Sequence, residues 1–114
     1  MTKITSREVD GVSVVTLYGR IVFGEGSNAL REKMKSLIAE GKKKIVLDMK
    51  NIDYIDSSGL GTLVAAHLSA STQGAAMRLC NLSRKFSEVL LLTKLTAVFQ
   101  VYSTEAAAVA SFAK

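Results

Sequence analysis

Asp56-Ser57-Ser58-Gly59-Leu60-Gly61 lies between a strand-like apolar run at residues 45–49 and a helix-like run at residues 63–68 of this 114-residue chain. The first N–H groups of a helix have no partner inside the helix, and the helix dipole is positive at that end. The stretch therefore predicts a helix N-terminus that carries two serine hydroxyls. Such an end is suited to hold a phosphate group.

A plainer interpretation of the same stretch is a helix cap. Asp and Ser occupy the N-cap position routinely, and each stabilises a helix there by about 1 kcal/mol. Local physics alone favours this interpretation over a site of modification. The residues by themselves leave both alternatives open.

The rest of the chain predicts alternating strands and helices after an initial hairpin. The hairpin turn is expected at Asp10-Gly11, between strands at 3–9 and 12–18, and the second strand is apolar on both faces, which is typical of an interior strand. Further strands are expected at 44–49, 75–82 and 98–102, and helices at about 28–40, 57–73, 84–93 and from 104 onward. This order predicts a single α/β domain over residues 1–114, with a mixed sheet of four to five strands and about four helices.

The two longer predicted helices differ in their faces. Ser27 or Asn28 is expected to cap the first helix, whose apolar positions recur at helical spacing from Leu30 to Ile38. The second helix has an apolar stripe that is expected to face the core, namely Leu60, Leu63, Val64, His67, Leu68 and Ser71. Its other face consists of small residues and is expected to remain open to a partner, namely Thr62, Ala65, Ala66, Ser69, Ala70 and Gln73.

Composition narrows the functional classes. The hydrophobic fraction of 48% suffices for a core, and the formal net charge of +5 is concentrated in residues 31–50, where cations follow a predicted helix end at Gly41. No aromatic residues interleave with these cations, so a nucleic-acid surface is disfavoured. A single cysteine, Cys80, and the lack of a long apolar run predict a cytoplasmic protein without a membrane span.

Catalytic and cofactor motifs are missing from the sequence. Neither serine of the stretch has the glycine pattern of a hydrolase elbow, and the only histidine, His67, lies about three turns further along the same predicted helix. His67 and Cys80 are too few for a zinc site, and no phosphate-binding loop of the G-x-x-x-x-G-K-[ST] type occurs. We therefore expect no catalytic residues, no metal and no cofactor.

The segment from Ile45 to Asp48, followed by residues 52–61, resembles the STAS family of bacterial anti-sigma factor antagonists. The resemblance extends from Val12 to about Phe112 and includes Asn81-Leu82-Ser83 before a helix. It implies an anti-sigma factor antagonist that acts in transcription regulation by partner switching. It also implies that the hydroxyl just after the Asp, Ser57, is phosphorylated.

The resemblance implies a set of partners as well. The unphosphorylated protein would bind an anti-sigma factor, often a serine protein kinase, phosphorylation would release it, and a phosphatase would reset it. A monomer or weak dimer is expected. The partner surface would comprise the start of the second helix and the loop before the first helix, with the residues Asp56, Ser58, Gly59, Gly61, Thr62, Ala66, Val22 and Glu25.

One position departs from the family pattern. Val22 stands where many members carry an Asp that affects kinase recognition, and Glu25 is a candidate to replace that carboxylate. The alternative is a STAS scaffold or sensory module that binds partners or a small ligand without a phosphate cycle. A third reading, nucleotide binding, follows from reports of guanine nucleotide binding by some relatives.

Overall fold

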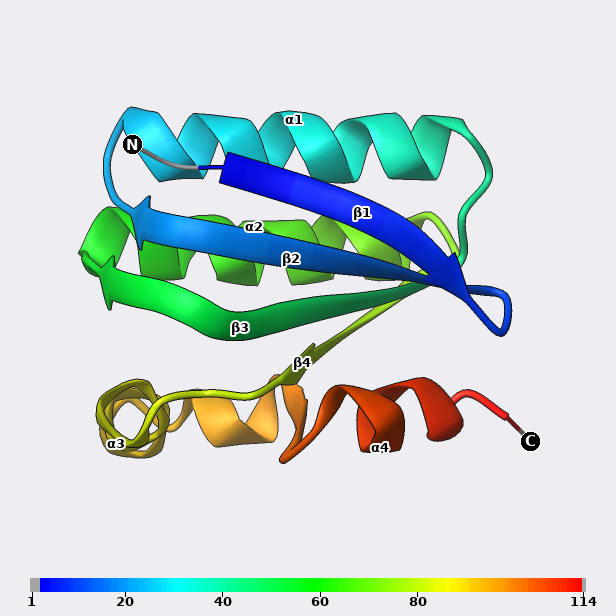
Figure 1. The fold of residues 1–114 in the computed structure, drawn as a ribbon. Coiled ribbons are helices and arrows are strands. Elements are labelled where there is room, and N and C mark those ends of the chain that lie inside the picture. Colours follow the sequence, from blue (N-terminus) through cyan, green and yellow to red (C-terminus); the bar gives the residue numbers. More distant parts are fainter. Residues whose placement is uncertain (1–2, 114) are drawn as a thin grey trace.

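A computed structural model describes residues 3–113, except for the side chain of Glu25. Strands and helices alternate after an initial hairpin (Figure 1). The strands are β1 (Lys3–Val9), β2 (Val12–Ile21), β3 (Lys44–Ile55), β4 (Ala76–Cys80) and β5 (Gln100–Tyr102). The α-helices are α1 (Glu25–Ala39), α2 (Ser57–Thr72), α3 (Arg84–Leu92) and α4 (Glu105–Ala110), and a 3-10 helix, η1, spans Leu95–Ala97.

The strands form one mixed sheet in the order β1-β2-β3-β4-β5. β1 and β2 are antiparallel, and their turn has positive φ at both Asp10 (52°) and Gly11 (81°), as a two-residue hairpin requires. The remaining neighbours pair in parallel, with helices as crossovers. The predicted hairpin, the interior position of β2 and the mixed α/β sheet are confirmed.

β2 and β3 are both longer than predicted. The expected ends at residues 18 and 49 are wrong, because the two strands continue to pair up to Ile21 and Ile55. Their register shifts twice, between Thr16 and Tyr18 and between Gly19 and Arg20, so β3 carries extra residues relative to β2. These bulges break the alternation of side chains that marks a strand in sequence. The extension brings the ends of both strands to one edge of the sheet.

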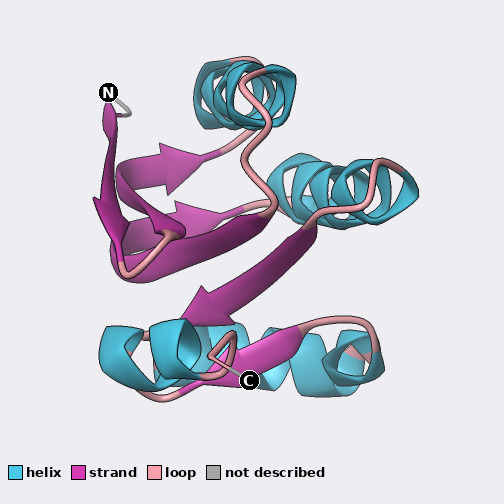
Figure 2. Cartoon of the chain, turned by 90° about the vertical axis from the view of Figure 1, so that its right-hand side faces the viewer, coloured by secondary structure: helices cyan, strands magenta, loops and turns pink. Residues whose placement is uncertain are grey.

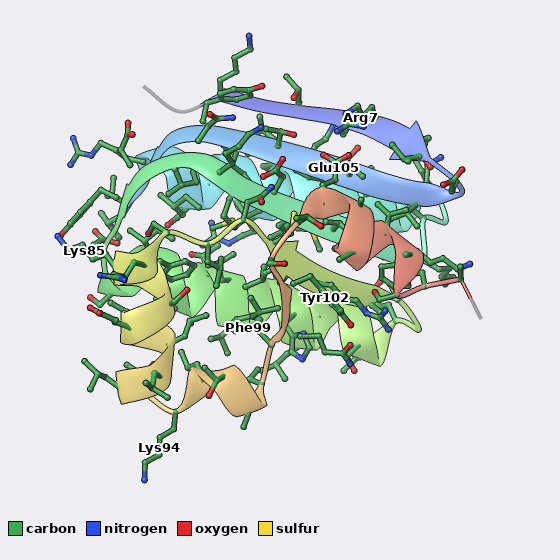
Figure 3. The ribbon with its side chains drawn as sticks, turned by 60° about the horizontal axis from the view of Figure 1, so that its bottom comes forward. Arg7, Lys85, Lys94, Phe99, Tyr102 and Glu105 are labelled. Atoms are coloured by element: carbon green, nitrogen blue, oxygen red, sulfur yellow. The ribbon has the colours of Figure 1, made fainter. Side chains whose placement is uncertain are left out.

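Helices cover both faces of the sheet. α1 and α2 lie together over one face, and α4 lies on the opposite side (Figure 2). The larger core contains Leu30, Met34 and Leu37 of α1, as the predicted stripe requires. The smaller core joins α4 to the sheet, and Glu105 of α4 forms an ion pair with Arg7 of β1 (Figure 3).

The predicted faces of α2 are partly wrong. Leu68 is 56% exposed, whereas Thr62, Ala66 and Ala70 are buried. The physical reason is that α2 packs against α1 as well as against the sheet, so its buried arc is wider than one apolar stripe. The small side chains on this arc serve the contact between the two helices.

Candidate functional site

Asp56 is the N-cap of α2 and connects three segments. Its Oδ1 accepts a hydrogen bond from the Gly59 amide (2.8 Å), and its Oδ2 accepts one from the Phe23 amide (3.2 Å). The Asp56 amide donates to the Ile21 carbonyl at 3.3 Å. The hydrogen bond from Gly59 is the main cause that lowers the pKa of Asp56 below its ordinary value. The predicted cap is therefore present, and it also holds the loop between β2 and α1 against the start of α2.

Ser57 and Ser58 form the first turn of α2, and both are exposed. The predicted helix start at Ser57 is confirmed, and its hydroxyl is open to solvent at the positive end of a 16-residue helix. The Ser58 carbonyl accepts a hydrogen bond from the Thr62 hydroxyl (3.0 Å) within the helix. An enzyme could thus reach the Ser57 hydroxyl without unfolding the helix.

The two glycines of the stretch have different roles. A Cβ built on Gly59 would lie 2.0 Å from the Ile21 carbonyl oxygen, whereas one built on Gly61 would meet nothing within 4 Å. Gly59, which was expected in the partner surface, is buried, and its missing side chain lets α2 pack on the end of β2. Gly61 is exposed and remains available to a partner.

The other predicted partner-binding residues differ in how exposed they are to solvent. Thr62 and Ala66 are only 7% and 8% exposed, so the expectation that they form an open face is wrong. Val22 is half-buried, and its carbonyl accepts a hydrogen bond from the Ser27 amide (3.2 Å). The side chain of Glu25 lies outside the described residues, so its predicted role as a substitute carboxylate is not addressed.

The loop before α1 supplies a residue that the sequence analysis did not single out. Phe23 is 83% exposed, and its amide donates to Asp56. Its backbone is therefore fixed to the α2 N-terminus while its ring projects into solvent. The sequence signal that could have identified Phe23 is a large apolar residue inside a glycine-rich loop.

Two hollows flank the serines. The first holds about 300 Å³ and lies between the end of β3 and α3. Its lining includes Asp56, Ser57 and Lys85, the last of which is at the start of α3 (Figure 3). Its floor is mainly apolar and includes Met49, Ile52, Ile55, Leu60, Phe86 and Val89. The second holds about 340 Å³ between the first turns of α1 and α2, and is lined by Phe23, Ser58 and Gly61 among others.

The residues considered for catalysis or metal binding lie away from Ser57. His67 packs edge-on against Phe99, with ring centroids 5.5 Å apart, as expected of a structural residue. Cys80 is fully buried, and burial raises the pKa of its thiol to about 12. Among the side chains that the structure describes, no group of three or more from His, Cys, Asp and Glu is placed to hold a metal ion. No helix within residues 3–113 is long and apolar enough to cross a bilayer.

Sequence comparison decides the family. The sequence profile of the STAS domain matches residues 3–108, nearly the whole chain. The chain therefore belongs to the STAS domain family. This STAS protein is 30% identical over 111 residues to BtrV of Bordetella bronchiseptica, whose name gives it as a candidate anti-sigma factor antagonist; the match covers 96% of this chain and 94% of BtrV. It is 28% identical over 96 residues to the anti-sigma F factor antagonist of Paenibacillus polymyxa, covering 83% of this chain and 81% of that protein.

Solved structures share the fold. An anti-sigma factor antagonist from Mycobacterium paratuberculosis superimposes with a TM-score of 0.87 at 22% identity, covering all of this chain and 96% of that chain. The phosphorylated form of the Bacillus protein SpoIIAA superimposes with a TM-score of 0.73 at 20% identity, covering 96% of this chain and 99% of that chain. The predicted STAS fold is thus confirmed.

Proposed function

We propose that this STAS protein is an anti-sigma factor antagonist. In its unphosphorylated form it binds an anti-sigma factor, and phosphorylation of Ser57 by a serine kinase releases it. The names of the sequence relatives support the class of partner. The observation that carries the phosphorylation step is the exposed Ser57 hydroxyl at the first position of α2, next to the fixed carboxylate of Asp56.

The proposed switch is electrostatic and local. A phosphoryl group adds roughly −1.5 to −2 charges at pH 7 and three acceptor oxygens. The dipole of α2 stabilises that charge, so the fold itself need not change. A partner surface that fits a neutral hydroxyl beside Asp56 would instead face a bulky dianion. Each 1.4 kcal/mol lost from the contact weakens binding about tenfold.

The partner surface that we propose surrounds this serine. It combines Phe23, Ser57, Ser58 and Gly61, which are exposed and lie on two segments joined by the hydrogen bonds of Asp56. Aromatic side chains anchored on a rigid backbone are frequent hot spots of binding. In the proposed surface, the exposed Phe23 takes the place of the buried Thr62 and Ala66.

Serine variants test the proposal. A candidate anti-sigma factor of the serine kinase class from the same organism is incubated with the chain and ATP, and the modified residue is identified by mass spectrometry. We expect phosphate on Ser57 in the wild type and in Ser58→Ala, and none in Ser57→Ala. A phosphate on another residue, or none in the wild type, would overturn the assignment.

Partner affinity tests the electrostatic step separately. We expect Ser57→Asp to weaken binding at least tenfold, or about 1.4 kcal/mol. Ser57→Ala should bind within about threefold of the wild type, because it removes only one exposed hydroxyl. Equal affinities of the two variants would contradict the switch.

A Val22→Asp variant, which restores the family's usual carboxylate, should be phosphorylated faster than the wild type if that position governs kinase recognition.

The second candidate function is a ligand-binding module without a phosphate cycle. The hollow beside Ser57, with its apolar floor and volume of about 300 Å³, favours it, since small-molecule sites are concave and mostly apolar. Titration calorimetry with ATP and GTP tests the nucleotide version. An absence of heat with both nucleotides would exclude nucleotide binding. A fragment screen tests apolar ligands, with a Val89→Trp variant that fills the hollow as the comparison to the wild type.

A further inference from the structure

The hollow between α1 and α2 brings the N-termini of two long helices together. α1 has 15 residues and α2 has 16, and both begin at the edge of the sheet where β2 and β3 end. The positive ends of both dipoles therefore point toward the same region. Asp56 caps α2 with its side chain, whereas the N-cap of α1 is Gly24, which has no side chain to cap the helix. The expectation that Ser27 or Asn28 would cap α1 is wrong, because the helix begins at Glu25 and both residues lie inside its first turn.

Ser27 provides an independent observation at this hollow. Only 3% of the surface of Ser27 is exposed, and the residue lines the hollow. Its Oγ nevertheless has no hydrogen-bond partner among the described residues. A buried hydroxyl without a partner costs free energy, so native proteins usually satisfy it.

The remaining polar groups are also donors. Arg31 lines the hollow, and its Nη1 donates to the Asn28 Oδ1 at 2.8 Å. That bond leaves the other guanidinium N–H groups and the Asn28 amide nitrogen for a ligand. The Ser58 hydroxyl lies on the α2 side. None of the described side chains that line this hollow is acidic, and Asp56 is not among them.

We propose that this hollow binds a small oxyanion, a phosphate or a carboxylate. Arg31 supplies the charge, Ser27, Asn28 and Ser58 supply further donors, and the two helix dipoles add a favourable field. The site is separate from the Ser57 hydroxyl, which lines the other hollow. The proposal goes beyond the antagonist function and does not depend on it.

A phosphate titration of the full chain tests the proposal. The shifts of the ¹⁵N–¹H resonances are followed against inorganic phosphate, with sodium chloride keeping the ionic strength constant. We expect saturable shifts that centre on residues 24–28 and 58–62. A parallel titration with acetate distinguishes the source: comparable affinity indicates an acidic side chain as the natural ligand, and much tighter phosphate binding indicates a phosphate group.

Variants of the lining residues test which side chains bind the phosphate. Arg31→Gln should weaken phosphate binding at least tenfold, because it removes a charge-assisted hydrogen bond. Ser27→Ala should weaken it about threefold to tenfold while it leaves thermal stability unchanged or raises it, because it removes an unsatisfied buried hydroxyl. Arg84→Gln is the matched control, since Arg84 is at the start of α3, where the Ser83 hydroxyl already accepts from the Phe86 amide at 3.1 Å. It should leave the affinity unchanged.

Two results would overturn the site. One is a set of linear, unsaturable shifts spread over the surface lysines. The other is equal weakening by Arg31→Gln and Arg84→Gln, which would indicate general charge screening. Both can be read even if partner binding by the same protein fails, because the titration uses the chain alone.

Discussion

Gly59 and Gly61 permit a sharp test of the α2 packing, because the same substitution should have opposite effects two residues apart. In Gly59→Ala the new Cβ would lie 2.0 Å from the Ile21 carbonyl oxygen and 2.9 Å from its carbon. Both atoms belong to the backbone of β2, so relief requires a shift of α2 or of the strand end rather than a side-chain rotation. Gly61→Ala meets nothing within 4 Å.

The magnitudes follow from two competing effects. Overpacking of a tight site costs typically 1–3 kcal/mol, and a clash with backbone belongs at about the upper end. Alanine in place of glycine in a helix contributes about 1 kcal/mol in the other direction. We therefore expect Gly59→Ala to destabilise by about 2 kcal/mol net. Gly61→Ala should stabilise by roughly 0.5–1 kcal/mol, since only the propensity effect operates.

Urea denaturation monitored by circular dichroism measures both differences in unfolding free energy. The reasoning is refuted if the two variants agree within about 0.5 kcal/mol, or if Gly59→Ala is the more stable one. Partner affinity adds a second measurement. If Gly61 lies in the proposed partner surface, Gly61→Ala should weaken binding despite its higher stability.

Three further predictions concern other parts of the site and core. The pKa of Asp56 is lowered in the folded chain, so its carboxylate stabilises the protein above the unfolded pKa of about 3.9, and this contribution is lost as the pH falls through the lower folded value. The stability advantage of the wild type over Asp56→Asn should accordingly be larger at pH 6 than near pH 2 in thermal melts. Cys80, whose thiol pKa is about 12, should not react with a disulfide reagent at pH 8 until urea unfolds the chain; rapid labelling of the native protein would contradict its burial. Phe23→Ala and Leu92→Ala remove side chains that are 83% and 81% exposed, so neither should change the melting temperature, but only Phe23→Ala should weaken partner binding.

Much of the architecture could be predicted because its signals are local. Asp10-Gly11 specifies the hairpin turn through backbone conformations that few other residues adopt. The apolar spacing from Leu30 to Leu37 specifies the buried side of α1. Asp56 specifies the start of α2 through a hydrogen bond to Gly59, only three residues away.

The errors occur where distant segments meet. The ends of β2 and β3 were placed too early because both strands continue through bulges, which depend on the pairing of the two strands and not on their local sequence. The open face expected on α2 is closed by α1, a helix that is far away in sequence. The first turn of α1 begins before Ser27, so that residue lines a hollow instead of capping a helix.

The sequence by itself determined that a helix with two serines at its start follows a buried strand, and its motif determined the STAS family. Hydrogen bonds and periodicity within a few residues suffice for such features. Only the tertiary structure decided which residues around Ser57 are accessible: it buried Gly59, Thr62 and Ala66, exposed Phe23, and brought the first turns of α1 and α2 together. Accessibility depends on which surfaces pack against each other, and those contacts join segments that the local pattern of residues cannot relate.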